Sequence, residues 1–227
     1  MLFRSALYDG EIRLVDDHIG KLRADLERLG VADKTIIAVV ADHGDEFFEH
    51  GNKGHHRTLY REVLRVPWIL YVPGATGPRR RIDEEASLVD VTPTLLGLAG
   101  IAQPQGVEGK DFTDLLTGAR ATESLRTVHA ELYRKGSLNV QVAAISDHAK
   151  LIQHFNVRRA ELYDLTSDAE EHELRPLAEA RSSFAALRDW LDVRWLAYRN
   201  RESAHGIRSV TIDAKTAETL RSLGYVQ

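Results

Sequence analysis

Residues 35–44 read TIIAVVADHG, and this stretch indicates the fold class. Its first seven residues are apolar and rich in β-branched side chains, which is typical of a strand buried on both faces of a parallel sheet. Before it, apolar residues recur at three- and four-residue steps over Asp9–Leu29, so this segment is expected to form a helix that ends at Gly30. A helix, a short link and a buried strand form an α/β unit, and we therefore predict an α/β fold.

The rest of the chain divides into two parts with different patterns. Up to residue 106 the α/β pattern continues, with a strand expected over Val66–Val72 and a helix over Ser87–Leu98. The segment Gln103–Lys110 contains one proline and two glycines and marks the expected boundary. We therefore expect one domain over residues 1–106 and a smaller α+β subdomain over residues 107–227.

Short strands joined by tight links predominate in the second part. The expected elements are a short helix over Asp111–Thr117, strands over Val128–Leu132, Asn139–Ser146, Ala149–Phe155 and Glu161–Leu165, and helices over Ser183–Tyr198 and Thr211–Leu223. Asp147-His148 lies between the second and third of these strands and favours a hairpin. Together these elements predict a small antiparallel sheet with a covering helix.

Composition excludes several classes of protein. The 30 Lys and Arg residues nearly balance the 34 Asp and Glu residues, and the formal net charge of −4 argues against a general nucleic-acid binder or a polybasic membrane binder. The chain has no cysteine, so disulfides, zinc–thiolate sites, iron–sulfur clusters and cysteine nucleophiles are excluded within it. It also has no run of eighteen apolar residues that could cross a membrane.

A segment rich in histidine and acidic residues directly follows the first strand. It contains Asp42, His43, Asp45, Glu46, Glu49, His50, Lys53, His55 and His56. Ligands bind at the carboxyl ends of strands in α/β sheets, and Gly44 permits a turn that would bring Asp42 and His43 to one cavity. Carboxylates with imidazoles favour a divalent cation, and a cation beside Lys53 would suit a sulfate or phosphate group. The structural alternative is a turn carboxylate within a solvated charged loop.

Six motifs occur in order along the chain. They read YDGEI at 8–12 with VDDHIG at 15–20, IIAVVADHG at 36–44, EHG at 49–51 with TLYREVLRVP at 58–67, SLVDVTPTLL at 87–96 with GI at 100–101, ELYDL at 161–165, and LRSLGYV at 220–226. In this order they resemble the motifs of the sulfatases of the alkaline phosphatase superfamily. The resemblance implies part of that family's α/β/α sandwich over residues 1–106, followed by the small antiparallel sheet.

The resemblance also implies roles for individual residues. Asp42 matches the family's calcium-binding carboxylate, and His43 stands where the family has a residue that contacts the metal or the sulfate. His55 is implied as the residue that binds the sulfate ester and donates a proton to the leaving alcohol, with His56 and Lys53 as alternatives. The implied cofactor is a divalent metal, Ca²⁺ first, and the implied substrate is a sulfate ester, sulfated glycans included.

The family's nucleophile has no counterpart in this sequence. It is a formylglycine made from Cys or Ser in a Cys/Ser-x-Pro-x-Arg motif, and neither this motif nor the accompanying aspartate pair is present. We therefore expect the chain to be the C-terminal part of such an enzyme, with little or no turnover of its own. The strand at Thr35–Ala41 would then lack sheet neighbours, and its exposed apolar edge is expected to make the chain marginally stable or prone to aggregation. The resemblance implies a periplasmic or extracellular location.

Two other functions are compatible with the sequence. A phosphodiesterase or phosphonate monoester hydrolase of the same superfamily would share the Asp-His-Gly strand end and would use Mn²⁺ or Zn²⁺. A non-catalytic module would use the same fold to bind a sulfated glycan or a protein partner, and metal dependence of binding would separate it from the enzymes. Neither nucleic acid nor a membrane is an expected partner, and the oligomeric state is left open.

Overall fold

The computed structural model describes residues 2–75, 81–119, 126–133, 140–146, 148–155, 157, 159–179, 214 and 218. Contacts divide the chain into one unit over Met1–Phe184 and a second over Ala185–Gln227. The domain boundary expected after residue 106 stays a prediction. The covering helix expected over Ser183–Tyr198 lies outside the described residues. None of the described helices combines the length and apolar character needed to cross a bilayer.

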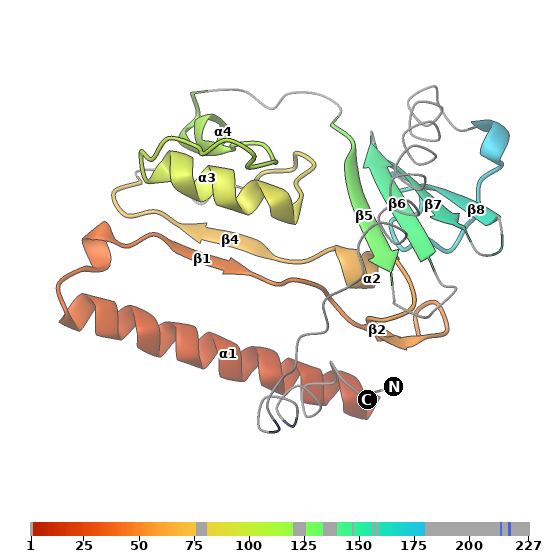
Figure 1. Ribbon diagram of the computed structural model, residues 1–227. Coiled ribbons are helices and arrows are strands. Elements are labelled where there is room, and N and C mark those ends of the chain that lie inside the picture. The colour runs from red at the N-terminus through yellow and green to blue at the C-terminus, as the bar shows by residue number, and fades with distance from the viewer. Residues whose placement is uncertain are drawn as a thin grey trace. The chain divides into compact units, whose positions relative to one another are not determined.

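The α/β part is layered, with the strand pair β1–β4 between helices (Figure 1). Helix α1 spans Leu2–Arg28, β1 spans Ile37–Val40 and β4 spans Trp68–Tyr71. On one face the guanidinium of Arg23 in α1 lies 5.7 Å from the centre of the Tyr71 ring. On the other face Trp68 packs edge-on against Phe112, with ring centres 5.8 Å apart. Helices on both faces of a sheet confirm the α/β fold class.

The direction and depth of the first strand differ from the expectation. β1 pairs antiparallel with β4, in a register that places Val40 opposite Trp68 and Ile37 opposite Tyr71. All four residues of β1 are only partly buried. The parallel, fully buried arrangement was wrong for the described pair because an apolar run indicates burial and carries no information about strand direction. The short helix α2, Arg61–Leu64, reverses the chain between the two strands.

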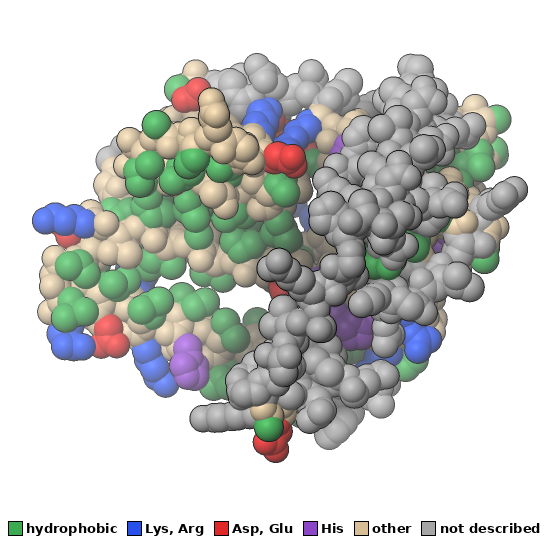
Figure 2. Space-filling view, viewed as in Figure 1, with side chains coloured by type: hydrophobic (Ala, Val, Ile, Leu, Met, Phe, Trp, Pro, Cys, Tyr) green, Lys and Arg blue, Asp and Glu red, His purple; other side chains and the backbone are tan. Residues whose placement is uncertain are grey.

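The expected apolar stripe on α1 faces solvent within the described structure. Ile12, Val15 and Leu22 each expose more than half of their surface. Figure 2 shows apolar side chains gathered along α1 and over α3, which spans Val91–Leu98. This exposure concerns helices, whereas the exposed apolar edge expected for the strand at residues 35–41 stays a prediction.

Asp90 ties α3 to later parts of the chain. Its side chain is fully buried, and it accepts hydrogen bonds of 2.7 Å from the backbone N–H groups of Ser87 and Lys110. Arg126 pairs with both carboxylate oxygens, at 2.5 and 2.8 Å. The next helix, α4 over Thr113–Thr117, packs against α3. A carboxylate with four donors explains why an acidic residue occupies the interior here.

The four strands expected in the second part are confirmed. They are β5 at Val128–Tyr133, β6 at Val140–Ser146, β7 at Ala149–His154 and β8 at Arg159–Asp164. They form one antiparallel sheet in sequence order, and β6 and β7 meet at the expected hairpin. Leu59 reaches this sheet and packs with Ala143, Ile152 and Tyr163, so the segment after the histidine-rich loop shares a core with the sheet.

Candidate functional site

The Asp-His-Gly stretch leaves the end of β1 and presses against α2. The Gly44 N–H donates a 2.9 Å hydrogen bond to the Val63 carbonyl. A Cβ atom on Gly44 would lie 2.0 Å from the carbonyl oxygen of Glu62, closer than any real contact. Glycine is therefore required for close approach, and not for the turn that the sequence suggested, because Gly44 is not among the glycines with positive φ.

A small hairpin, which the sequence did not predict, lies directly after the Asp-His-Gly stretch. Strand β2 at Glu46–Phe47 pairs antiparallel with β3 at Lys53–Gly54. Phe48 adopts a left-handed φ of 77° and donates a 2.8 Å hydrogen bond to the Asn52 carbonyl, which closes the loop. The hairpin brings together residues at its two ends that are ten positions apart.

Asp45 and His55 meet at these two ends. Their side chains are joined by a 2.8 Å hydrogen bond between His55 Nδ1 and Asp45 Oδ1. The His55 ring also stacks on the His43 ring, with centres 3.8 Å apart and planes inclined by 26°. Donor atoms of His43, Asp45 and His55 all lie within 4.8 Å of one another. We name these three residues the open cluster, since each side chain is partly exposed.

The other predicted site residues lie around the open cluster. The Asp42 side chain is 78% exposed, and its Oδ2 lies 3.8 Å from His43 Nε2. His56 contacts the His55 ring at an edge, with ring centres 4.0 Å apart. Lys53 lies on β3 with an exposed side chain. Of the three residues weighed for the substrate-binding role, His55 alone belongs to the open cluster, while the roles of all three stay predictions.

The hydrogen bond to Asp45 sets the chemistry of His55. An ionised carboxylate can only accept hydrogen bonds, so Nδ1 of His55 is the donor and carries a proton, and Nε2 is the ring atom that can act on a ligand. Asp45 thus holds the imidazole in one orientation and one tautomer. Such a ring can bind an oxyanion when protonated and transfer a proton to a neighbouring oxygen.

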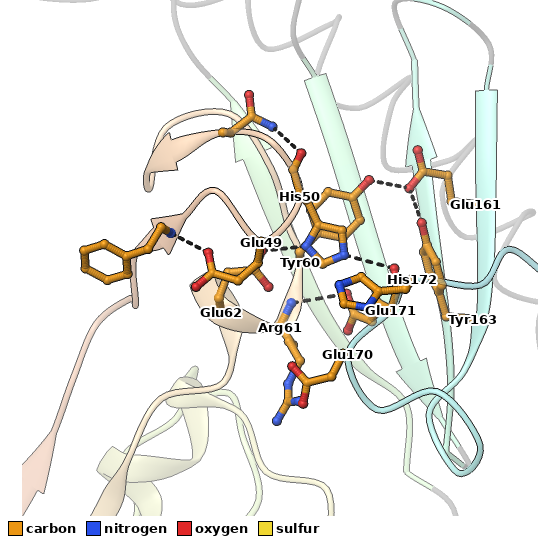
Figure 3. A network of polar contacts seen from close by, with 12 residues as sticks. Glu49, His50, Tyr60, Arg61, Glu62, Glu161, Tyr163, Glu170, Glu171 and His172 are labelled. Carbon is orange, nitrogen blue, oxygen red and sulfur yellow. Dashed lines mark hydrogen bonds and ion pairs between the residues drawn. The ribbon is translucent and has the colours of Figure 1, made fainter. Parts of the chain in front are cut away.

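A second cluster lies behind the hairpin, on its buried side. It consists of Glu46, His50 and Glu62, whose donor atoms also lie within 4.8 Å of one another, and we name it the buried cluster. His50 donates from Nδ1 to Glu62 Oε1 at 2.7 Å and from Nε2 to the Glu171 carbonyl at 2.9 Å (Figure 3). Its ring stacks on Tyr60, with centres 3.8 Å apart.

Both ring nitrogens of His50 face oxygen atoms that can accept hydrogen bonds, an arrangement that favours the protonated imidazole. Burial by itself lowers the pKa of His50, but the hydrogen bonds to Glu62 and Glu171 and the charge of Glu62 raise it above its usual value. Burial raises the pKa of Glu46, opposed by the nearby Thr58 hydroxyl and assisted by the charge of Glu62.

Buried ion pairs connect this side of the hairpin to the four-stranded sheet. Lys150 on β7 is completely buried and contacts both carboxylate oxygens of Glu171 at 2.8 Å. Glu171 also accepts from the Arg61 backbone N–H at 3.2 Å. Burial lowers the pKa of Lys150 and raises that of Glu171, and the opposite charge of each partner counteracts these shifts.

Glu161 on β8 makes a second connection. Its Oε2 accepts hydrogen bonds of 2.9 Å from the hydroxyl groups of Tyr60 and Tyr163 (Figure 3). Burial raises the pKa of Glu161, but hydrogen bonds from His154, Tyr163 and Tyr60 outweigh it and lower the pKa to about 2. Burial, followed by the hydrogen bond to Glu161 and the charge of that carboxylate, raises the pKa of Tyr60 to about 12. This network fixes Tyr60, on which His50 stacks.

Comparison with known proteins identifies the segment that carries both clusters. The family model named Sulfatase matches residues 5–101. Residues 5–101 are therefore similar to the sulfatase family. An arylsulfatase of Clostridium perfringens is 36% identical over 120 residues, which are 52% of this chain and 25% of that protein.

Solved structures extend the likeness beyond the sulfatase segment. The structure of a 2-O GAG sulfatase matches with a TM-score of 0.66 and 25% identity over 88% of this chain and 43% of its own. A phosphonate monoester hydrolase from Silicibacter pomeroyi matches with a TM-score of 0.61 and 24% identity over 88% of this chain and 42% of its own, a likeness of fold. The chain therefore spans between a quarter and a half of the length of these relatives.

In this sulfatase segment the sequence pointed to the location of the site but not to its pairings. Asp45 as the partner of His55, and Glu62 as the partner of His50, were not anticipated. The glycines at 51 and 54 were only a partial signal for the first pairing: Gly51 lies in the hairpin loop and Gly54 on β3, and both adopt positive φ. No local signal existed for the second, which depends on the packing of α2 against the hairpin.

Proposed function

We propose that this protein is a hydrolase of sulfate esters and that Asp42, His43, Asp45 and His55 contribute to its active site. The observation that carries the proposal is the open cluster. Two imidazoles stack there, and a carboxylate is hydrogen-bonded to one of them, beyond the end of β1 and within the segment that matches the sulfatase family. Imidazoles beside an exposed carboxylate suit the binding of an oxyanion together with a cation.

Asp42 and His43 are the proposed holders of a divalent cation, with Ca²⁺ first. Asp42 Oδ2 and His43 Nε2 lie 3.8 Å apart, a separation that one ion can bridge, and the exposed Asp42 leaves room for further oxygen ligands. When bound, such an ion would neutralise charge on a sulfate group. Asp45 holds the ring of His55, and His55 Nε2 binds an oxygen of the ester and donates a proton to the leaving alcohol.

The proposed nucleophile is a formylglycine, for which this sequence contains no Cys/Ser-x-Pro-x-Arg source. We therefore expect the chain by itself to bind Ca²⁺ and sulfate weakly and to show little or no turnover. A sulfated glycan is the proposed natural substrate class, supported by the 2-O GAG sulfatase among the similar structures.

The test uses the imidazole NMR signals of the ¹⁵N-labelled chain, which detect weak binding. Millimolar Ca²⁺ is expected to shift the His43 signals, and millimolar sulfate added afterwards is expected to shift those of His55. The His55→Asn variant should lose the sulfate response, while His18→Asn, on the exposed side of α1, should keep it. Unchanged His43 and His55 signals under both titrations would contradict the proposal.

A phosphonate or phosphodiester hydrolase is the second candidate. It is favoured by the imidazole content of the open cluster, because imidazole suits Mn²⁺ or Zn²⁺ better than Ca²⁺. The same NMR titration with Mn²⁺ or Zn²⁺ and phenylphosphonate tests this candidate. A stronger response to these probes than to Ca²⁺ and sulfate would favour phosphoryl chemistry. Sulfate binding that needs no metal would favour the non-catalytic module.

A further inference from the structure

The buried cluster has the composition of a metal site that the proposed reaction does not use. Glu46 comes from β2, His50 from the hairpin loop and Glu62 from α2, so three separate segments converge on one point. We propose that Glu46, His50 and Glu62 bind a second divalent cation, of the Zn²⁺ type. This ion would be distinct from the one proposed at Asp42 and His43, and the inference does not depend on the proposed hydrolysis.

Glu46 supplies the first argument. Its side chain is 1% exposed, and within the described structure neither of its carboxylate oxygens forms a hydrogen bond, since the nearby Thr58 hydroxyl lies outside hydrogen-bond geometry. A buried carboxylate without a partner is strongly disfavoured, and proteins accommodate it by protonation, by pairing or by a bound cation. The three donor atoms lie within 4.8 Å of one another, so an ion between them would supply the partner that Glu46 lacks.

The orientation of His50 supplies the second argument. Metal-binding histidines commonly donate their other ring N–H to a backbone carbonyl or a carboxylate, which fixes the ring. His50 does this through Nε2 to the Glu171 carbonyl at 2.9 Å, and the stack on Tyr60 restrains the ring further. Its Nδ1 is consequently directed at the carboxylate side of the cluster, 2.7 Å from Glu62 Oε1.

The proton on Nδ1 occupies the position that the cation would take. Binding would displace this proton to solvent, and the Nδ1 lone pair would then coordinate the ion. Two carboxylates and one neutral imidazole around a divalent cation give a cluster with no net charge. One nitrogen and two oxygen ligands are a set that Zn²⁺ accepts readily, whereas Ca²⁺ prefers oxygen ligands alone.

The experiment measures Zn²⁺ binding to the chelator-treated chain in a His55→Ala background, which removes one donor of the open cluster. Isothermal titration in two buffers with different ionisation enthalpies is expected to give one Zn²⁺ per chain with release of at least one proton. Adding Glu46→Gln should weaken binding by about 100-fold. Glu49→Gln, the same change at an exposed residue of the same hairpin, should alter it less than about twofold.

A thermal-shift measurement separates loss of metal from loss of fold. Glu46→Gln removes a buried carboxylate without a partner, so without metal this variant should melt no lower than the parent. Zn²⁺ should raise the melting temperature of the parent but not that of Glu46→Gln or Glu62→Gln. The proposal is overturned if the parent binds no Zn²⁺ at micromolar concentrations, if Glu46→Gln retains the parent's affinity, or if binding releases no proton.

Discussion

The two faces of the hairpin β2–β3 carry similar residues in opposite environments. Asp45 and Glu46 are neighbours in sequence, yet Asp45 is partly exposed and pairs with His55, while Glu46 is buried beside His50. Successive side chains on an extended strand point to opposite faces, so one hairpin can serve both environments. The comparison teaches that the open face can present reactive groups because the buried face fixes the hairpin to the rest of the unit.

The largest expected effect comes from the pair of Lys150 and Glu171 behind the buried face. Lys150→Met leaves the Glu171 carboxylate buried without its cation, and we expect the free energy of unfolding to fall by about 3–5 kcal/mol. Urea denaturation followed by circular dichroism measures the change. The double variant Lys150→Met/Glu171→Leu should recover most of the loss, because it leaves no unpaired charge. If Lys150→Met alone lowered the free energy of unfolding by less than about 1 kcal/mol, the buried face would not stabilise the fold more than the open face does.

The next largest loss of stability is expected from Gly44→Ala, which should disturb both faces of the hairpin. The new Cβ would collide with the Glu62 carbonyl, and the required backbone shift is expected to cost about 1–3 kcal/mol. The His43 and His55 imidazole signals should move as well, since Gly44 anchors the strand end. Gly10→Ala is the matched control, because nothing lies within 4 Å of that helical position. It should stabilise the chain by about 0.5–1 kcal/mol, and equal losses in both variants would exclude the steric explanation.

The strands of this protein could be predicted from sequence because their signal is local. The apolar run at Thr35–Ala41 contains β1, and the short strands with tight links expected in the second part correspond to β5–β8. Strand direction could not be predicted, because the antiparallel pairing of β1 with β4 depends on how α2 turns the chain. For α1 the helix and its apolar face were likewise predicted correctly. What covers that face could not be predicted, since periodicity identifies only the apolar side of a helix.

The candidate site was predictable in place but not in pairing. The Asp-His-Gly sequence after β1 located it, because strand ends are where ligands bind in this class of fold. The hairpin that brings Asp45 to His55 depends on a left-handed φ at Phe48, a residue type that gives no sign of it. The contacts of His50 with Glu62 and with the Glu171 carbonyl join segments 12 and 121 residues away, and no local pattern encodes such separations.

Stability should depend on pH through His50. The pKa of His50 is raised in the folded chain. The stabilisation of the fold by its protonated ring is therefore fully present below the unfolded pKa near 6.5 and is lost as pH rises through the folded pKa. We expect the difference in unfolding free energy between the wild type and His50→Gln to shrink by roughly 1 kcal/mol from mildly acidic to alkaline pH. Denaturant titrations at several pH values measure it. A difference that stays constant would mean that His50 is neutral when folded.

The smallest effect on stability is expected on the open face, from Asp45→Ala. The Asp45–His55 pair is partly exposed, so its loss should cost less than about 1 kcal/mol. The chemistry should change more than the stability, because without Asp45 nothing on the hairpin selects the Nδ1–H form of His55. ¹⁵N signals of the ring should then shift toward the Nε2–H tautomer that free histidine prefers. If Asp45→Ala lowered the free energy of unfolding as much as Lys150→Met, the open face would also be needed to stabilise the fold, and its groups would not be available for chemistry.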